Sequence, residues 1–310
     1  MKLIRGAYNI DRALKGSVAT IGNFDGVHRG HQAVIAQVQA RAKALNAPTT
    51  AIIFEPQPAE FFAKEQPPTR IFPLRDKLRC LKVRDIDQVV CLPFNAALAA
   101  QSPEQFIEQY LVEGLAIQHL VIGDDFRFGA KRAGDFATLT AAGEQHGFTV
   151  EDSATVTEAD RRISSTWVRE ALAAHDLAQA EFLLGKPYKL SGRVAHGEKL
   201  GRTLGFPTLN LVLPAHNFPL KGVFAVKVHG LDDEVKLGVA NLGYRPSVSR
   251  GETFNLEVHV LDFEKMVYGK HILVEILHFL RDEQKFGSLM ELQKGIAKDI
   301  RSARAYFSAL

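Results

Sequence analysis

Two histidines near the N-terminus, His28 and His31, have the spacing and the neighbours of a phosphate site. They lie at the end of the run Gly-Asn-Phe-Asp-Gly-Val-His-Arg-Gly-His, residues 22–31. Its glycines let the backbone approach a phosphate closely, and a helix that starts here offers N–H donors and a positive dipole end. The imidazoles can hydrogen-bond phosphate oxygens and stabilise charge that develops at phosphorus.

Two other interpretations of this run are a structural turn and a zinc pair. We favour phosphate chemistry, because His-x-x-His lacks the spacing and the acidic partner of a His-Glu-x-x-His helix. The run also differs from the Gly-x-Gly-x-x-Gly dinucleotide fingerprint and from the Walker A loop. The absence of this fingerprint from the run argues against an oxidoreductase that transfers hydride with a nicotinamide cofactor.

Two further runs in the first half carry groups that suit a phosphorylated ligand. Residues 161–169, Arg-Arg-Ile-Ser-Ser-Thr-Trp-Val-Arg, precede a helical pattern. Their hydroxyls would cap that helix, and Arg169, one turn in, can hold phosphate oxygens with two N–H groups. An ordinary capped surface helix is the alternative. Residues 123–129, Gly-Asp-Asp-Phe-Arg-Phe-Gly, follow a strand directly and fit a ligand-contacting loop or a tight aromatic turn.

A glycine-spaced run in the second half ends in a pair of oxygen ligands. Residues 192–210 contain four glycines and finish as Pro-Thr-Leu-Asn. Thr208 and Asn210 alternate in an extended segment, so their side chains project to the same side. A hydroxyl and an amide carbonyl are hard ligands, suited to Mg²⁺ that also binds substrate phosphates. Such loops in β domains are more often turns than nucleotide sites, and that alternative stays open at this point.

Elements that could position these groups alternate between strand and helix in the first half. Strands are predicted at 18–22, 49–54, 88–94 and 119–123, with a helix at 31–46. Another helix is predicted to start at Ser102, with Pro103 at its first position and Gln105 at the capping-box position. This alternation predicts a parallel sheet covered by helices, with ligands at the carboxyl ends of the strands.

The second half changes to short strands at close spacing. Strands are predicted at 189–195, 222–228, 234–240, 254–261 and 272–280, and a final helix at 288–308. Leu289, Leu292, Ile296, Ile300 and Tyr306 would share one face of that helix. The pattern predicts an all-β barrel or sandwich. Because Gly185 and Pro187 break the preceding helix, we expect domains at 1–184 and 185–310.

Composition narrows the class of protein. The chain has 310 residues, enough for roughly two domains, and its 46% hydrophobic and 24% charged residues argue against disorder, collagen-like repeats and a coiled coil. A net charge of +3 without a basic stripe argues against a nucleic-acid partner. Cys80 and Cys91 lie in apolar contexts and argue against a disulfide framework. Without a signal-peptide pattern or a bilayer-length apolar stretch, we expect a cytoplasmic protein with no membrane partner.

Together, these runs resemble a known family. His-x-Gly-His at 28–31 with Ile-Ser-Ser-Thr-x-x-Arg at 163–169 resembles the nucleotidyltransferase signature. The longer runs at 22–31 and 123–129 resemble the adenylyltransferase half of the bacterial bifunctional riboflavin kinase/FAD synthetases. The run at 192–210, with Gly-Val-Ala-Asn-Leu-Gly-Tyr-Arg-Pro at 238–246 and Glu-Val-His-Val-Leu-Asp-Phe at 257–263, resembles their riboflavin kinase module. The resemblance covers nearly the whole chain and implies a Rossmann-like α/β nucleotidyltransferase domain, then a Greek-key barrel with a terminal helix.

The resemblance also implies the site residues. In the first domain it implies catalytic roles for His28, His31 and Arg169, ATP contacts at Gly22, Asn23, Phe24, Asp25, Gly30, Ser165 and Thr166, and FMN contacts at Asp125, Arg162, Pro56 and Pro58. In the second domain it implies Glu257 as general base, Thr208 and Asn210 as ligands of Mg²⁺ with ATP, ATP contacts at Gly192, Gly197, Gly201 and Gly205, and a flavin contact at Arg281. Taken without the resemblance, Glu257 is more often a solvated strand residue.

We therefore expect a two-step flavin enzyme. The barrel would phosphorylate riboflavin to FMN with ATP, and the α/β domain would join FMN to the AMP group of a second ATP, giving FAD and pyrophosphate. ATP, riboflavin and FMN are the expected small-molecule partners, in a monomer or weak homo-oligomer. Three alternatives stay open: a silent kinase half, a flavin-binding or storage protein without turnover, and an adenylyl- or cytidylyltransferase for another substrate with an appended β module.

Overall fold

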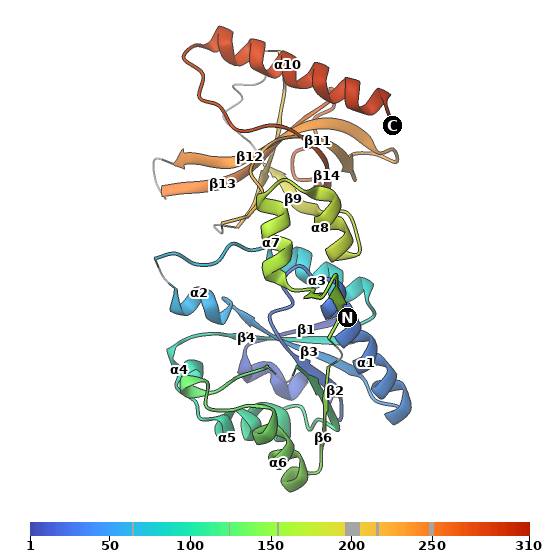
Figure 1. Ribbon diagram of the computed structural model, residues 1–310, viewed down its shortest axis with the longest axis vertical. Coiled ribbons are helices and arrows are strands. Elements are labelled where there is room, and N and C mark those ends of the chain that lie inside the picture. Colours follow the sequence, from blue (N-terminus) through green and yellow to red (C-terminus); the bar gives the residue numbers. More distant parts are fainter. Residues whose placement is uncertain (64, 124, 154, 196–204, 215–216, 248–250) are drawn as a thin grey trace. The chain divides into compact units, whose positions relative to one another are not determined.

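The chain forms two compact units in a computed structural model (Figure 1). The structure describes all residues except 64, 124, 154, 196–204, 215–216 and 248–250. Unit 1 comprises Met1–Pro68 and Lys77–Ser164, and unit 2 comprises Thr69–Asp76 and Ser165–Leu310. A short early segment of the chain thus belongs to the second unit.

Unit 1 is built on a six-stranded parallel sheet with the strand order β1-β4-β3-β2-β5-β6. Its strands are β1 (Lys2–Arg5), β2 (Val18–Ile21), β3 (Thr49–Glu55), β4 (Gln88–Pro93), β5 (His119–Ile122) and β6 (Thr149–Asp152). The four inner strands were predicted. The edge strands β1 and β6 were missed, because their partly exposed residues form no continuous apolar run.

Helices cover both faces of this sheet. Helix α1 (Arg29–Leu45) packs Val38 and Ala42 against Val18 on one face. On the other face, Phe106 of α5 (Pro103–Phe106) packs into the core with residues such as Ile52. Ser102 caps α5 and exchanges hydrogen bonds with Gln105, which confirms the predicted capping box. The remaining elements include η1 (Ala7–Arg12), α2 (Pro58–Phe62), α3 (Leu74–Val83), α4 (Ala96–Ala99), η2 (Ile107–Val112), η3 (Ala130–Arg132), α6 (Phe136–His146), β7 (Thr157–Glu158) and β8 (Arg161–Arg162).

Unit 2 contains a closed antiparallel barrel with the strand order β10-β13-β12-β11-β14-β9. Its strands are β9 (Lys189–Ala195), β10 (Leu209–Val212), β11 (Gly222–His229), β12 (Lys236–Ser247), β13 (Gly251–Val260) and β14 (His271–Arg281). Because β14 returns to lie beside β11, the four strands β11 to β14 form a Greek key. The structure is a barrel rather than a sandwich, and β10 occupies the segment that was expected only to be extended.

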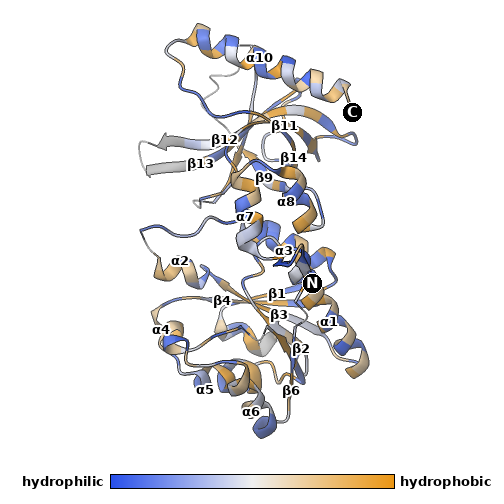
Figure 2. Ribbon diagram, in the orientation of Figure 1, coloured by the Kyte–Doolittle hydropathy of each residue, from blue (hydrophilic) through white to orange (hydrophobic). Residues whose placement is uncertain are grey.

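The C-terminal helix α10 (Leu289–Ser308) packs on the outer surface of the barrel. Ile300 and Tyr306 of this helix contact the apolar patch that includes Val223 and Ala225 of β11. Figure 2 shows hydrophobic and hydrophilic residues alternating along α10, as a one-sided helix requires. Leu289 is 58% exposed, although its spacing assigns it to the same face. Helical spacing predicts the direction in which the Leu289 side chain points, but it does not predict whether the barrel surface extends far enough to cover it.

The segment Thr69–Asp76, which we call the strap, is bonded to the start of the barrel within unit 2. The Tyr188 hydroxyl donates to the carbonyl of Ile71 at 2.9 Å, and both groups are buried. The N–H of Ser191 donates to Asp76 Oδ2 at 3.1 Å. Tyr188, directly before β9, and Ser191, within it, therefore satisfy buried polar groups with residues that come more than 100 positions earlier.

The expected domain boundary lies at the end of α8 (Leu177–Leu184), where Gly185 takes a left-handed conformation with φ 64°. Helices α7 (Ser165–Ala173) and α8 precede that boundary and belong to unit 2. The division at 184/185 stays a prediction.

Candidate active sites

The two inner strands β2 and β5 mark the point where the strand order of the sheet reverses. They pair in parallel through Thr20 and Val121. The segments that follow them, residues 22–28 and 123–129, therefore leave the sheet at the same edge. In open α/β sheets, ligands bind at this edge and at this switch point.

The loop after β2 is held in one shape by its own buried residues. Phe24 and Val27 have positive φ angles of 47° and 45°, and their exposed fractions are 2% and 0%. Non-glycine residues keep this conformation only where the surrounding packing holds it. Asp25, between them, is 1% exposed. Of the predicted ATP contacts in this loop, Phe24 and Asp25 thus lie beneath its surface.

His28 is the N-cap residue of α1, and its Nδ1 accepts a hydrogen bond from the N–H of His31 at 3.3 Å. In the neutral ring the proton therefore lies on Nε2, which makes Nε2 a donor. The two imidazoles stack with centroids 3.7 Å apart. A Cβ at Gly30 would lie 3.1 Å from the His28 ring, so glycine leaves room for the stack. The helix begins at Arg29, and both rings flank its N-terminus, where an anion is favoured.

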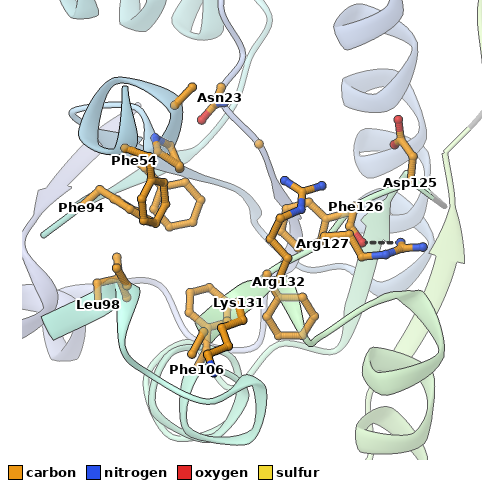
Figure 3. Close-up of a pocket in the computed structure, with 18 residues that line it drawn as sticks. Asn23, Phe54, Phe94, Leu98, Phe106, Asp125, Phe126, Arg127, Lys131 and Arg132 are labelled. Carbon is orange, nitrogen blue, oxygen red and sulfur yellow. Dashed lines mark hydrogen bonds between the residues drawn. The ribbon is translucent and has the colours of Figure 1, made fainter. Parts of the chain in front are cut away.

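A cavity of about 860 Å³ opens beside this loop (Figure 3). Gly22 and Asn23 line it at the end of β2. Six of its other lining residues are aromatic: Phe54, Phe62, Phe94, Phe106, Phe126 and Phe128. A flat aromatic ligand fits such a cavity, because aromatic rings prefer offset or edge contacts with one another.

Two predicted flavin contacts, of which Asp125 lines this cavity, are paired with each other. Arg162 Nη1 donates to Asp125 Oδ2 at 2.6 Å, and the two side chains are 49% and 64% exposed. A Cβ at Gly123 would lie 2.9 Å from Asp125 Oδ1, so glycine lets this carboxylate approach the strand end. Asp125 and Pro58 line the cavity, whereas Pro56 is not one of its lining residues.

Three further predicted residues, Ser165, Thr166 and Arg169, lie on α7 in unit 2. Ser165 is the first residue of the helix, and Thr166 is exposed. Arg169 Nε donates to the carbonyl of Thr69 in the strap at 2.6 Å. Their action on a nucleotide together with the histidine pair stays a prediction.

Glu257, the predicted general base, lies on β13 between two asparagines. Asn210 on β10 and Asn241 on β12 are its direct cross-strand neighbours. Leu256 and Val258 are both fully buried in the barrel, so Glu257 points to the outer face. Opposed residues on antiparallel strands have Cβ atoms about 4.5–5.5 Å apart. The predicted base and one predicted Mg²⁺ ligand are therefore neighbours.

Asn241 is a candidate functional residue that the sequence reasoning missed. Its Nδ2 donates to Glu283 Oε1 at 3.1 Å. The Glu283 carboxylate lies over Gly243, where any Cβ would overlap it. The signal that the sequence offered for Asn241 was a polar residue between two apolar ones, Ala240 and Leu242. In the structure both of these neighbours are fully buried. A polar residue at that position of a strand faces outward, toward the same face as Glu257.

Thr208, the other predicted Mg²⁺ ligand, comes directly before β10. The carbonyl of Pro207 accepts a hydrogen bond from His259 Nδ1 at 2.9 Å. His259 lies two residues after Glu257 on β13, so it faces the same side. This bond holds the Pro-Thr turn against the strand that carries Glu257.

Comparisons with known proteins cover both units. Residues 10–167 match the model of the FAD synthetase family, and residues 184–307 match the model of the riboflavin kinase family. The chain is 48% identical over 309 residues to the bifunctional riboflavin kinase/FMN adenylyltransferase of Haemophilus influenzae, with 100% of both chains covered. It is 49% identical over 308 residues to the protein of the same name from Escherichia coli, which covers 99% of this chain and 98% of that one.

The chain belongs to the bifunctional riboflavin kinase/FMN adenylyltransferase family. Its fold is also similar to the crystal structure of a protein named macrolide-efflux protein from Streptococcus pneumoniae. The TM-score is 0.78 at 27% identity, over 98% of this chain and 99% of that one. Within the residues of this chain that the structure describes, no helix combines the length and the hydrophobicity needed to cross a lipid bilayer.

The four glycines of unit 2 that were predicted to contact ATP differ in their surroundings. Gly192 packs inside the barrel, where its Cβ would lie 2.9 Å from the Cβ of Leu211. Gly205 has φ 84° with open space around it, as in a tight turn. Gly197 and Gly201 lie outside the described residues. A packing role thus accounts for Gly192 without a nucleotide.

Arg281, which resembles a flavin contact of the family, is engaged within unit 2. Its Nε and Nη2 donate to the two carboxylate oxygens of Asp299 on α10 at 2.8 and 2.7 Å. Its Nη1 donates to the carbonyl of Asp282 at 2.7 Å. Arg281 therefore ties α10 to the end of β14, and a direct contact with flavin stays a prediction.

Among the described residues, no group of three or more His, Cys, Asp and Glu side chains could hold a metal ion. Mg²⁺ in phosphoryl-transfer enzymes is often bound by few protein ligands, with water and substrate phosphates completing its shell. The hydroxyl of Thr208 and the amide oxygen of Asn210 suit an ion bound in that way.

Proposed function

We propose that the chain phosphorylates riboflavin to FMN in unit 2 and transfers AMP from a second ATP to FMN in unit 1. The products of the second step are FAD and pyrophosphate. Full-length similarity to bifunctional riboflavin kinase/FMN adenylyltransferases supports both steps. The observation that carries the assignment of roles is the cross-strand pairing of Asn210 with Glu257 on the outer face of the barrel.

In the kinase step, Glu257 accepts the proton of the terminal ribityl hydroxyl. The hydroxyl oxygen then bonds to the γ-phosphorus of ATP, the bond from that phosphorus to the bridging oxygen breaks, and ADP leaves. A hydroxyl is a poor nucleophile until its proton is accepted, which is why a carboxylate is needed here. Asn241 donates to Glu283 and lies opposite Glu257, so it orders the polar groups around the base.

Thr208 and Asn210 would hold Mg²⁺ that is bound to the phosphates of ATP. The ion supplies neutralisation of phosphate charge and orientation of the nucleotide. Asn210 lies beside Glu257, so a nucleotide held there presents its phosphates near the base. The His259 bond to the carbonyl of Pro207 keeps Thr208 close to the same strand.

In the adenylyl step, a phosphate oxygen of FMN attacks the α-phosphorus of ATP. The bond from that phosphorus to the bridging oxygen of the β-phosphate breaks, and pyrophosphate leaves. The FMN phosphate is largely ionised at neutral pH, so this step needs no general base. It needs donors for the charge on the crowded phosphorus, and His28 Nε2 beside the N-terminus of α1 can supply one. The aromatic cavity would hold the flavin ring.

Product analysis tests this proposal directly. Purified full-length chain is incubated with riboflavin, ATP and Mg²⁺, and the flavins are separated by chromatography. We expect FMN followed by FAD. Asn210→Ala should leave riboflavin unconverted, and His28→Ala should stop the reaction at FMN. Absence of both FMN and FAD with the wild-type chain would overturn the proposal.

The same experiment separates the alternative functions. FAD formed from supplied FMN but never from riboflavin would indicate a silent kinase half. Flavin binding without ATP consumption would indicate a storage protein. If flavins are neither bound nor converted, another nucleotidyltransferase substrate is required. The cytoplasmic location, the oligomeric state and the absence of a nucleic-acid partner stay predictions.

A further inference from the structure

Three cations line the cavity of unit 1 and take no part in the roles described so far: Arg127, Lys131 and Arg132. Figure 3 shows Arg127 and Arg132 across the cavity from Phe54 and Phe94. Lys131 and Arg132 are both exposed, and neither forms an ion pair with a carboxylate within the part of the chain that the structure describes. The cations thus lie among aromatic residues on that side of the cavity, because Phe126 and Phe128 flank Arg127 in the chain.

The turn that carries the two exposed cations has a fixed backbone. Lys131 and Arg132 are consecutive residues with positive φ angles of 54° and 60°. Just before them, Gly129 packs so tightly on the start of α5 that its Cβ would lie 2.8 Å from the backbone nitrogen of Pro103. A turn held in this way presents its side chains without further ordering of the backbone, which reduces the entropic cost of binding a ligand.

The charge of the cavity favours an anion. Asp125 is the single acidic residue among those that line the described cavity, and Arg162 neutralises it at 2.6 Å. Lys131 and Arg132 thus add positive charge to the wall that the paired Asp125 does not offset. A phosphate dianion that enters the cavity would meet a net positive wall.

We propose that Arg132, assisted by Lys131, binds the phosphate of FMN and makes unit 1 select the phosphorylated flavin over riboflavin. This inference rests on the proposed adenylyl step. The aromatic wall contacts the ring system, which FMN and riboflavin share, so that wall cannot distinguish them. The phosphate is the difference, and a guanidinium can donate two parallel hydrogen bonds to it. Selection matters because riboflavin in this cavity has no phosphate to attack ATP.

The test compares a charged and a neutral flavin in the same cavity. Full-length wild type, Arg132→Gln, Lys131→Gln and Arg132→Lys are assayed for FAD formation from FMN and ATP. Lumiflavin serves as the neutral competitor, because it lacks the ribityl hydroxyl and unit 2 cannot phosphorylate it. We expect Arg132→Gln to raise the KM for FMN about tenfold or more, with the inhibition constant of lumiflavin changed less than twofold. Lys131→Gln should have a smaller effect, and Arg132→Lys should retain part of the affinity.

Arg5→Gln is the matched control, since Arg5 is an exposed arginine of the same unit that does not line the cavity. A parallel rise of the FMN KM and the lumiflavin inhibition constant would mean that Arg132 shapes the cavity, and it would overturn the proposal. So would an unchanged FMN KM, or a rise confined to the KM for ATP, which would assign the cations to the nucleotide. Failure of the adenylyl assignment itself would be distinguishable, because the wild type would then form no FAD from FMN.

Discussion

Asn210 and Glu257 are directly opposed residues of β10 and β13 on the outer face of the barrel. Asn241 of β12 flanks Glu257 on its other side. The carboxylate is thus set between two amides, while the adjacent residues Leu256 and Val258 fill the barrel. This register places a proton acceptor beside a candidate ligand of the Mg²⁺-nucleotide.

Glu257→Gln should lower the kcat of riboflavin phosphorylation by about 10²–10⁴-fold, which is the usual contribution of a general base. FAD formation from supplied FMN should be unchanged, because that step belongs to unit 1. The two rates are measured separately by product chromatography. Glu264→Gln, a substitution of an exposed glutamate in the same unit, is the control and should change neither rate. Equal loss of both rates would indicate misfolding instead of lost proton transfer.

Gly243→Ala should destabilise unit 2 by no more than about 1 kcal/mol, because the exposed carboxylate of Glu283, which the added Cβ overlaps, can move aside at the loss of its hydrogen bond from Asn241. In a Glu283→Ala background the same change should cost much less. Chemical denaturation of the four proteins of this double-mutant cycle gives the coupling energy. Additive effects would show that Gly243 is required for another reason.

Arg281→Met should destabilise the docking of α10 by about 3 kcal/mol, since it leaves the carboxylate of Asp299 buried and without its cation. Asp299→Asn should loosen the same helix. The double change Arg281→Met with Asp299→Leu should recover much of the stability, as apolar replacements of buried ion pairs often do. Hydrogen exchange of α10 amides is the measurement. Normal exchange in Arg281→Met would refute an anchoring role.

His28→Asn separates the capping role of this residue from its proposed chemical role. Asparagine is a good N-cap residue, so this variant should keep the stability of α1, whereas His28→Ala should lose about 1 kcal/mol. Both variants lack the imidazole and should form little FAD from FMN. Thermal denaturation and product analysis are compared side by side. Full activity in the asparagine variant would remove the imidazole from the mechanism.

His119 should make unit 1 less stable in mild acid. Burial lowers the pKa of His119 below its ordinary value of 6.5, although the hydrogen bond to Glu151 opposes this shift. The unfolded chain therefore takes up the proton at a higher pH than the folded chain, and stability falls as the pH drops from 6.5 through the folded value. Arg41 lowers the pKa of Glu151 below 4.5, so Glu151 does not titrate in that range.

Stability is measured as the denaturant midpoint of unfolding at pH 7.5 and pH 5.5. Pulsed hydrogen exchange then reports the protection of the amides of β5 at the same two pH values. Wild type should lose more stability between the two pH values than His119→Gln, which has no titrating group at this position. Equal losses would assign the acid sensitivity to other residues.

Much of the fold follows from local sequence. The four inner strands of unit 1 are covered on both faces, so they form continuous apolar runs that pattern reasoning finds. The edge strand β1 and the short β10 carry mixed residues with half-exposed positions, and no such run marks them. The choice between barrel and sandwich depends on how β9 and β10 close the sheet, which is a property of pairing and not of composition.

The candidate sites also contain residues that the local sequence predicts and residues that only the folded structure brings together. Runs such as Pro-Thr-x-Asn are visible because their residues are close in sequence. The grouping of Asn210, Glu257 and Asn241 depends on strand register, and Asn241 was therefore missed. Lys131 and Arg132 have the sequence character of surface charges, and only the folded turn brings them to the wall of an aromatic cavity.

The strap has a consequence for synthesis of the protein on the ribosome. Ile71 emerges 117 residues before Tyr188, the hydroxyl of which it binds. A nascent chain must therefore carry the strap unpaired while most of unit 1 is translated, and the barrel can close only when nearly the whole polypeptide has left the exit tunnel. A gene fragment starting at residue 185 would encode every strand of the barrel and still lack the acceptors for Tyr188 and Ser191.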